Sequence, residues 1–286
     1  MSGSLGEALG QAALDEALPG SLVLVGAGRM GAGLLQGWLA AGLRPGGVTV
    51  VEPHPSAELS ASCAQQGVPL RVRAEGIAAP EVLVLAVKPQ GLAAAAPGLQ
   101  GLAGAGTLVV SILAGKTLSD LRASFPGAGA FVRAMPNLPA SIGRGATGAV
   151  ASPEAGPAQR AAAQALLAAV GTVEWVESED LIDAVTAVSG SGPAYVFHLA
   201  ECLAEAGRAA GLPADLASRL ARATVSGAGE LLALSDRPAG QLREDVTSPG
   251  GTTAAALDVL RDEAALERLM VRAVAAAKRR AEELSG

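Results

Sequence analysis

The stretch Leu22-Val-Leu-Val-Gly-Ala-Gly-Arg-Met-Gly31 decides the fold of this chain. Its four leading apolar residues predict a buried strand, and three glycines follow at the spacing G-x-G-x-x-G. A helix-compatible sequence comes next, over residues 32–43. In the order strand, glycine turn, helix, this spacing is typical of dinucleotide binding, because the N–H groups that open the helix attract the pyrophosphate.

Each glycine has its own task in such a turn. Gly26 makes the turn, Gly28 lets the pyrophosphate approach the backbone, and Gly31 allows the helix to pack on the strand. The predicted cofactor-binding segment also includes the residues between them, Ala27, Arg29 and Met30.

Glu52 follows the next predicted strand, residues 48–51, and stands 21 positions after Gly31. A carboxylate at about this distance commonly hydrogen-bonds the adenosine ribose of NAD and repels the 2′-phosphate of NADP. No Arg or Lys stands between Glu52 and Gln66 to receive that phosphate. The sequence therefore favours NADH over NADPH, the alternative being that Glu52 simply faces solvent.

Further strands are predicted at 82–86, 107–111 and 130–133, and each runs into small or polar residues. Ligands of open parallel sheets bind beyond the carboxyl ends of the strands. The segment Val87-Lys88-Pro89 and Asn137 are therefore candidates to line the cofactor cleft. A surface lysine and a turn-forming asparagine are the alternative interpretations.

From about residue 159 the sequence becomes rich in alanine and leucine with helical periodicity, apart from a strand-like piece at 172–176. We expect an α/β dinucleotide-binding domain of the Rossmann type over residues 21–176, after a flexible or partly helical leader at 1–20 that lies outside the fold. An all-α domain for substrate binding and dimerisation is expected over 177–286. Its helices are too apolar for one copy to bury, so a homodimer is expected.

Residues 247–253, Thr-Ser-Pro-Gly-Gly-Thr-Thr, carry no charge and precede an apolar run. The two glycines let the backbone turn tightly and lie close to a ligand. A helix begins at once, so the N–H groups of Gly251, Thr252 and Thr253 should be unpaired donors that attract a carboxylate or phosphate. An ordinary loop and helix cap is the alternative.

A second glycine-rich break, Val188-Ser-Gly-Ser-Gly-Pro-Ala-Tyr195, opens another predicted helix. Such a turn exposes hydroxyl groups and backbone donors near a ligand, and Pro193 suits the first helical position. The alternative is an ordinary helix start.

Composition excludes several classes of protein. The net charge of −6 argues against a nucleic-acid partner, and no apolar run is long enough to cross a membrane. Two cysteines cannot build a disulfide framework, and the leader lacks the basic start of a signal peptide, so a cytoplasmic location is expected. With two histidines in the whole chain, we expect no metal centre; His198 and Cys202, four residues apart, predict an ordinary helix pair.

A set of motifs stands in order between Ser21 and Leu284: the glycine turn, Val87-Lys-Pro89, Ser111-x-x-Ala-Gly115, Met135-Pro-Asn137, Asp180-Leu-Ile-Asp183, Ser189-Gly-Ser-Gly-Pro193 and Asp245-Val-Thr-Ser-Pro-Gly-Gly-Thr-Thr253. In order and spacing they resemble the pyrroline-5-carboxylate reductase family. The resemblance implies reduction of 1-pyrroline-5-carboxylate to L-proline with NADPH or NADH, the last step of proline biosynthesis. It also implies a helical domain that interlocks into a dimer, in many members assembled further into decamers.

The resemblance assigns roles to single residues. Thr253 matches a threonine whose hydroxyl group hydrogen-bonds the ring nitrogen, and Gly251 and Thr252 match backbone donors for the substrate carboxylate. Thr253 and Ser189 are thus the catalytic candidates. The remaining lining residues implied are Pro193 on the substrate side and Val87, Lys88, Pro89, Ala114 and Asn137 on the cofactor side.

Three other functions stay open at this point. A hydroxyacid dehydrogenase of similar layout needs a lysine on a central helix of the second domain, and the second half of this chain holds only Lys278, near its end. A reductase of another cyclic imine, such as piperideine-2-carboxylate, differs only modestly in substrate ring size. A non-catalytic nucleotide sensor would need no intact 247–253 segment.

Overall fold

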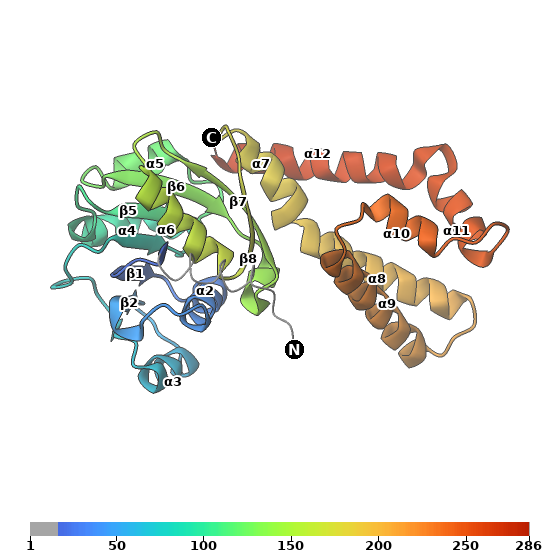
Figure 1. Ribbon diagram of the computed structural model, residues 1–286, viewed down its shortest axis with the longest axis horizontal. Coiled ribbons are helices and arrows are strands. Elements are labelled where there is room, and N and C mark those ends of the chain that lie inside the picture. Colours follow the sequence, from blue (N-terminus) through green and yellow to red (C-terminus); the bar gives the residue numbers. More distant parts are fainter. Residues whose placement is uncertain (1–16, 286) are drawn as a thin grey trace. The chain divides into compact units, whose positions relative to one another are not determined.

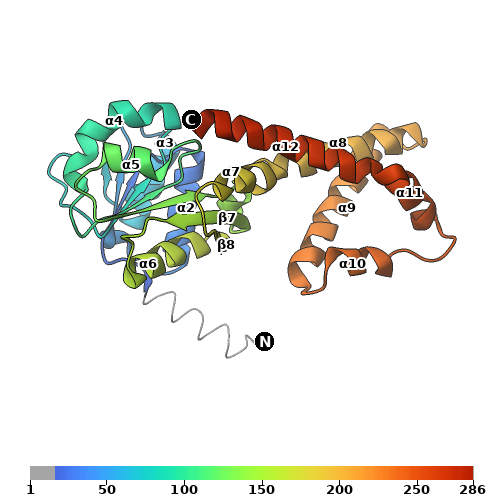
Figure 2. The same cartoon turned by 90° about the horizontal axis from the view of Figure 1, so that it is seen from above.

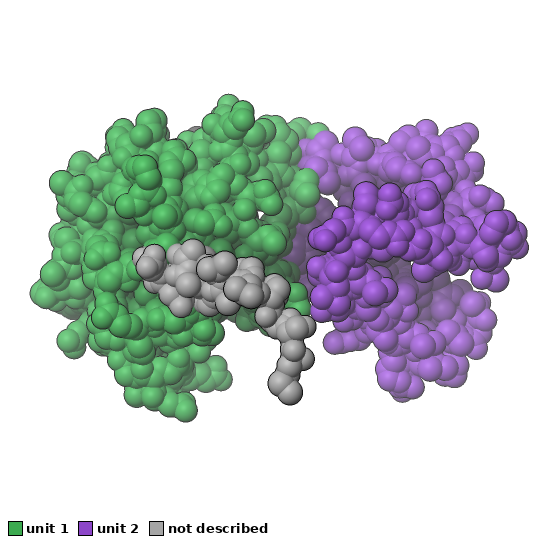
Figure 3. Space-filling model, viewed as in Figure 1, with its two compact units in different colours: residues 1–190, 278–286 green, residues 191–277 purple. Residues whose placement is uncertain are grey.

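The computed structural model describes residues 17–285, which form two compact units (Figure 3). The first unit runs to Gly190 and includes the chain again from Lys278, whereas the second is Ser191–Ala277. This division differs from the expected boundary between residues 176 and 177. The reason is that the chain after 176 still packs on the first unit, where Ile182 is 1% exposed.

An eight-stranded sheet forms the centre of the first unit, with the order β3-β2-β1-β4-β5-β6-β7-β8 (Figure 1). Neighbouring strands run parallel except β6 and β7. Both faces of β1 and β4 are buried, as expected of a parallel sheet covered on two sides. The strands are β1 Leu22–Val25, β2 Val48–Val51, β3 Leu70–Arg71, β4 Val82–Leu85, β5 Leu108–Ser111, β6 Ala130–Met135, β7 Gly145–Ala151 and β8 Gly171–Trp175.

Helices cover both faces of this sheet. Buried side chains of α2, α3 and α6 pack on one face, and those of α4 and α5 pack on the other. Figure 2 shows α4 and α5 on one side of the sheet and α6 on the opposite side. The helices of this unit are α2 Arg29–Ala40, α3 Ala57–Gln66, α4 Leu92–Leu99, α5 Leu118–Ser124, α6 Pro157–Ala168 and α7 Leu181–Val185, followed by the π-helical turn η5, Thr186–Gly190.

Trp38 joins α2 to α6. It is 1% exposed, and its indole N–H donates a hydrogen bond of 2.8 Å to the carbonyl oxygen of Leu166. Leu166 lies in the last turn of α6, where carbonyl groups have no partner within the helix. The tryptophan therefore satisfies a helix end that would otherwise be buried without a donor.

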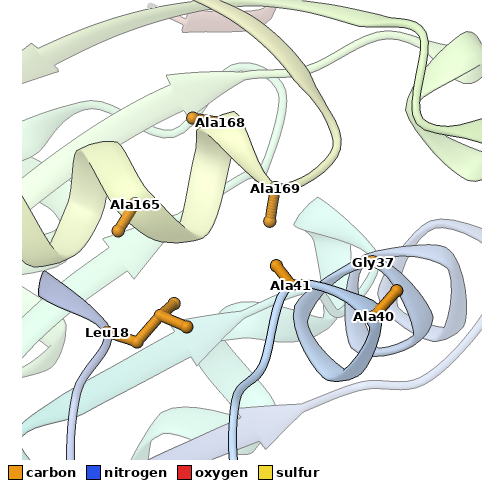
Figure 4. A pocket seen from close by; sticks show the side chains of 7 residues that line it. All are labelled: Leu18, Gly37, Ala40, Ala41, Ala165, Ala168 and Ala169. Carbon is orange, nitrogen blue, oxygen red and sulfur yellow. The ribbon is translucent and has the colours of Figure 1, made fainter. Parts of the chain in front are cut away.

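The end of the expected leader is packed rather than flexible. Leu18 lies against the core, and the N–H of Gly20 donates to the Glu81 carboxylate at 3.0 Å. Leu18 also borders a depression of about 320 Å³ between α2 and α6, whose other lining residues are glycine and alanine (Figure 4). The leader expectation was thus wrong for residues 17–20, and its remainder lies outside the described residues.

The second unit is helical, as the sequence predicted. Its first two helices pack through small residues, since Ala217 and Ala221 are 2% and 3% exposed. Large apolar side chains such as Phe197 and Leu231 are exposed, which is expected of a surface that another subunit covers. The helices are α8 Gly192–Ala209, α9 Ala214–Leu234, α10 Ala239–Asp245, α11 Thr252–Arg261 and α12 Ala265–Ser285, of which the last residues belong to the first unit.

None of the helices in the described part of the chain combines the length and hydropathy needed to cross a membrane.

Replacing Trp38 tests how the sheet and its helices are joined. Trp38→Phe leaves the Leu166 carbonyl without its donor and should lower the free energy of unfolding by about 1–3 kcal/mol. Urea unfolding followed by circular dichroism measures the change. Trp175→Phe is the control, because its indole N–H donates to the half-buried side chain of Gln164 and not to a buried main-chain carbonyl group. Equal losses in the two variants would contradict this role of Trp38.

Candidate active site

Two glycines of the glycine-rich turn lie very close to neighbouring backbone atoms. Gly26 has φ +87°, and a Cβ atom there would lie 2.7 Å from the carbonyl oxygen of Ala86. A Cβ atom on Gly31 would lie 2.2 Å from the carbonyl oxygen of Gly26. Both positions therefore require glycine. Around Gly28, in contrast, nothing lies within 4 Å of a Cβ position, so this exposed side of the turn leaves room for a ligand.

Helix α2 opens directly behind this turn without a side-chain cap. Gly28 is its N-cap residue, and the first turn holds no acidic side chain. The backbone donors of Arg29, Met30 and Gly31 are therefore left to a ligand or to water, at the positive end of the helix dipole. This is the arrangement that binds a phosphate group.

Three loops meet at the same edge of the sheet. Strands β1, β4 and β5 are neighbours and parallel, so the glycine turn, the segment 87–89 and the loop after β5 all lie beyond their carboxyl ends. Val87 contacts the turn itself, since its N atom lies 2.8 Å from the Cβ position of Gly26. Lys88 and Ala114 are exposed, whereas Pro89 is half-buried and opens a 3-10 turn.

Glu52 is fastened to the glycine-rich turn. Its carboxylate accepts hydrogen bonds from the backbone N–H of Ala27 at 2.9 Å and from that of His54 at 3.1 Å. The half-buried side chain therefore does more than face solvent. Each carboxylate oxygen has a second lone pair, so Glu52 retains the capacity to accept from ribose hydroxyl groups.

The sequence did not predict that two arginines lie in and after the strand next to Glu52. The backbone N–H of Glu52 donates to the carbonyl oxygen of Arg71 at 2.9 Å, because β3 pairs with β2. Arg71 and the nearby Arg73 are both exposed. Both arginines lie beyond Gln66, in and after this two-residue strand, and the alternating Leu-Arg-Val-Arg at 70–73 is the sequence signal for it.

Asn137 and Ser189 are joined to each other and to β7. The Asn137 side-chain amide donates to the carbonyl and hydroxyl oxygens of Ser189, each at 3.2 Å, and accepts from the N–H of Ala146 at 2.9 Å. The Ser189 hydroxyl group donates to the carbonyl oxygen of Ala146 at 2.8 Å. The hydrogen-bonding groups of both side chains therefore hold this junction together.

In the second unit, a tight turn precedes α11. The N–H of Gly251 donates to the carbonyl oxygen of Ser248 at 3.0 Å, and Gly250 has φ +70°, as in a type II turn with Pro249 before the glycine. The expectation of an unpaired Gly251 N–H was therefore wrong, because the turn uses this donor. Of the three backbone N–H groups expected to bind an anion at the start of α11, those of Thr252 and Thr253 are left.

The start of α11 is otherwise open. Thr252 and Thr253 are its first two residues, and no side chain caps it. Thr252 is exposed and Thr253 is half-buried. Such a helix start attracts a carboxylate with about 0.3–1 kcal/mol, and more where the site is partly buried.

The entry to this turn is braced by an ion pair. Arg237 donates to both carboxylate oxygens of Asp245, at 2.6 and 3.0 Å, and thereby lowers the pKa of that carboxyl group. The Thr247 hydroxyl group donates to the carbonyl oxygen of Arg243 at 2.6 Å. The other candidate of this unit, Pro193, is half-buried at the second position of α8, one residue later than expected.

His198 and Cys202 form the expected helix pair. The Sγ atom of Cys202 lies 3.6 Å from Nε2 of His198, whose Nδ1 lies 3.0 Å from the carboxylate of Glu201. Among residues 17–285, no three His, Cys, Asp or Glu side chains gather as a metal site would require.

The fold and these residues define a class of protein. A Rossmann-type sheet, an uncapped helix behind a glycine-rich turn and a carboxylate after β2 are the features of an oxidoreductase that binds a nicotinamide dinucleotide. Residues 21–115 match the family model described as NADP oxidoreductase, coenzyme F420-dependent. Residues 179–284 match the model for pyrroline-5-carboxylate reductase dimerisation.

Individual relatives narrow this class. The pyrroline-5-carboxylate reductase of Pseudomonas aeruginosa is 38% identical over 92% of this chain and 96% of its own length. That of Synechocystis is 47% identical over 71% of this chain and 75% of its own length. The chain therefore belongs to the pyrroline-5-carboxylate reductase family.

Solved structures agree with this assignment. A pyrroline-5-carboxylate reductase from Coxiella burnetii superposes with a TM-score of 0.87 at 35% identity, covering 94% of this chain and 99% of its own. A pyrroline carboxylate reductase from Plasmodium falciparum, solved with NADP bound, has a TM-score of 0.75 at 26% identity and covers 93% and 98%.

Ser189→Ala tests whether the serine hydroxyl group is structural. Its loss removes a donor from the Ala146 carbonyl and a partner from Asn137, which should lower the free energy of unfolding by about 1–3 kcal/mol. Thermal unfolding measures this loss. Ser141→Ala is a matched control, since this exposed hydroxyl group also donates to a backbone carbonyl. If the melting temperature of Ser189→Ala is no lower than that of Ser141→Ala, the Ser189 hydroxyl group has no structural role.

Proposed function

We propose that this protein reduces 1-pyrroline-5-carboxylate to L-proline, the final step of proline biosynthesis, with NADPH or NADH as the reductant. The observation that carries the proposal is the open start of α11 behind the Ser248–Gly251 turn. It offers backbone donors to a small carboxylate, in a chain whose other unit has the dinucleotide-binding turn. A nucleotide sensor does not account for this second anion site. A hydroxyacid dehydrogenase would also bind a carboxylate, but it needs a lysine on a central helix of the second domain, and the second half of this chain holds one lysine, Lys278, near its end.

The cofactor site fits a dinucleotide. Gly28 leaves open space beside the donors of α2, and Glu52 lies at the same turn. When bound there, the cofactor supplies the hydride that reduces the carbon–nitrogen double bond. The residues that would hold it are the glycine turn 26–31, Glu52, the segment 87–89 and Ala114.

The chain's own residues then have modest chemical tasks. The N–H groups of Thr252 and Thr253 would hold the substrate carboxylate, and the Thr253 hydroxyl group would hydrogen-bond the ring nitrogen. A protonated imine is already electrophilic, so the chain needs no strong general acid. Catalysis would come mainly from positioning the reactants and excluding water.

For Ser189 we propose a positioning role in place of the catalytic one that the resemblance implies. Its proton is donated to the Ala146 carbonyl, and its oxygen accepts from Asn137. We therefore assign both residues to positioning: they tie η5 to the ends of β6 and β7. Pro193, which follows η5 in the chain, would border the substrate.

The preference between cofactors is a finer proposal, and we propose that NADH is favoured. Glu52 supports it, because a carboxylate repels a 2′-phosphate. Arg71 and Arg73 oppose it, because the Arg71 backbone pairs with that of Glu52 and both arginine side chains are exposed, so they are candidates to receive that phosphate. We therefore expect a moderate preference rather than exclusion of NADPH.

Assembly and location complete the proposal. The exposed apolar side chains of α8 and α9 support a homodimer through the helical unit, and the family resemblance extends this to decamers.

Both cysteines are free, as in a reducing compartment, and burial raises the pKa of the Cys63 thiol. We place the protein in the cytoplasm on this basis.

Turnover is the test of this function. Protein, 1-pyrroline-5-carboxylate and either NADH or NADPH are mixed, the absorbance of the reduced nicotinamide is followed, and proline is identified among the products. Substrate-dependent oxidation with formation of proline supports the proposal. Binding of the dinucleotide without turnover would direct the search to other cyclic imines.

Thr253→Ala tests the hydroxyl group at the start of α11. Loss of one positioned hydrogen-bonding group should lower turnover by about 10–1000-fold. Thr252→Ala is the control: it keeps both backbone donors and removes only an exposed hydroxyl group, so turnover should fall far less. A wild-type rate in Thr253→Ala would remove this residue from the mechanism.

Glu52→Ser tests the cofactor preference. The shorter neutral side chain abolishes the repulsion, so the ratio of kcat/KM for NADPH to that for NADH should rise by about tenfold, the equivalent of one charge interaction of ~1.4 kcal/mol. The comparison variant is Glu58→Ser, an exposed carboxylate in the first turn of α3. An unchanged ratio in Glu52→Ser would mean that Glu52 does not act on the ribose.

A further inference from the structure

The C-terminal end of α12 belongs to the first unit, although most of this helix does not. Its last turn lies at the segment that follows β5, residues 112–117, which we term the β5 loop. Figure 2 shows the end of α12 beside this unit. The contact matters because Ala114 of this loop is one of the candidate cofactor-binding residues.

The first contact joins two backbones. Gly115 has φ +69°, and a Cβ atom there would lie 2.6 Å from the carbonyl oxygen of Leu284 and 3.3 Å from its Cβ atom. The nearest obstacle is main chain, so no flexible side chain can move aside. Only glycine lets the β5 loop and the end of α12 approach this closely.

The second contact is a buried charge cluster. Arg133 of β6 is 3% exposed and donates to the carboxylates of Glu179 at 3.0 Å and Asp183 at 3.4 Å. The Ser285 hydroxyl group donates to Asp183 at 3.2 Å and accepts from Arg133 at 3.4 Å. The last described residue of α12 is therefore part of the hydrogen-bonded shell of a buried guanidinium group.

The same cluster holds the far end of the loop. The Oε1 atom of Glu179 that accepts from Arg133 also accepts from the backbone N–H of Leu118 at 2.8 Å. Leu118 is the first residue of α5 and directly follows the β5 loop. At its near end, the Ser111 hydroxyl oxygen accepts from the N–H of Leu113 at 3.2 Å.

We propose that the end of α12, through Leu284 and Ser285, is a positioning element for the cofactor. It presses on Gly115 and completes the Arg133 cluster, so the β5 loop is fixed before a dinucleotide binds. A loop held in its bound conformation loses less entropy on binding, and affinity rises accordingly. This inference rests on the cofactor site of the proposed function.

Matched glycine substitutions provide the test. Gly115→Ala adds a methyl group against Leu284, whereas Gly67→Ala adds one where φ is also +69° but nothing lies within 4 Å. A second variant lacks residues 284–286 and removes the contact without touching the loop. NADH and NADPH affinities are measured by their fluorescence on binding, together with melting temperatures and the KM of the imine.

Gly115→Ala and the shortened chain should both raise the cofactor Kd by about three- to tenfold, the scale of ordering one or two groups. The KM of the imine should stay unchanged, and Gly67→Ala should bind the cofactor as the wild type does. A wild-type Kd in the shortened chain, or an equal change in Gly67→Ala, would overturn the inference.

The same experiment separates this inference from the proposed function. Wild-type protein that turns over the imine, with an unchanged Kd in both loop variants, overturns the inference alone. Wild-type protein that binds dinucleotides without turnover contradicts the proposed function, while the Kd values still decide the role of α12.

Discussion

The structure depends on one steric constraint, the approach of α2 to the turn that precedes it. A single carbon atom added to Gly31 would lie 2.2 Å from the carbonyl oxygen of Gly26. Because no side chain separates them, the helix starts directly over the end of β1 and directs its uncapped donors across the carboxyl edge of the sheet. Gly26 in turn lies against Ala86, so the same contact aligns β4 with the turn. The fold and the cofactor site thus follow from one local geometry.

The sequence predicted those parts of the fold that local patterns specify. The apolar runs of β1, β2, β4, β5 and β6 were recognised, and so were the helical second unit and the open start of α11. Strand β7, Gly145–Ala151, was missed because glycine and alanine have little strand propensity; it forms because β6 and β8 pair with it. The two residues of β3 are too short for any periodicity. Because β3 was not predicted, the position of Arg71 beside Glu52 was not predicted either.

The candidate site was predictable to the same degree. Residue types and spacing indicated Glu52, Asn137 and Ser189, but their partners come from distant segments. Ser189 therefore suggested a free hydroxyl group, whereas the folded chain uses its proton to hold β7. The Arg133 cluster joins residues far apart in the sequence, and of its members only Asp183 stood in one of the motifs, with nothing to indicate its partners. In the mechanism that we propose, the reductase needs little from its acids and bases, because the imine is reactive once it is positioned.

The most direct test of this account is to follow the transferred hydrogen. Reaction of 1-pyrroline-5-carboxylate with NADH in which both hydrogens at C4 of the nicotinamide are deuterium should yield proline with deuterium on the ring carbon that was double-bonded to nitrogen. Mass spectrometry of the proline, with fragmentation to locate the label, measures the outcome. Proline without deuterium, or no proline from protein that binds NADH, would contradict the central claim that this chain transfers hydride to the cyclic imine.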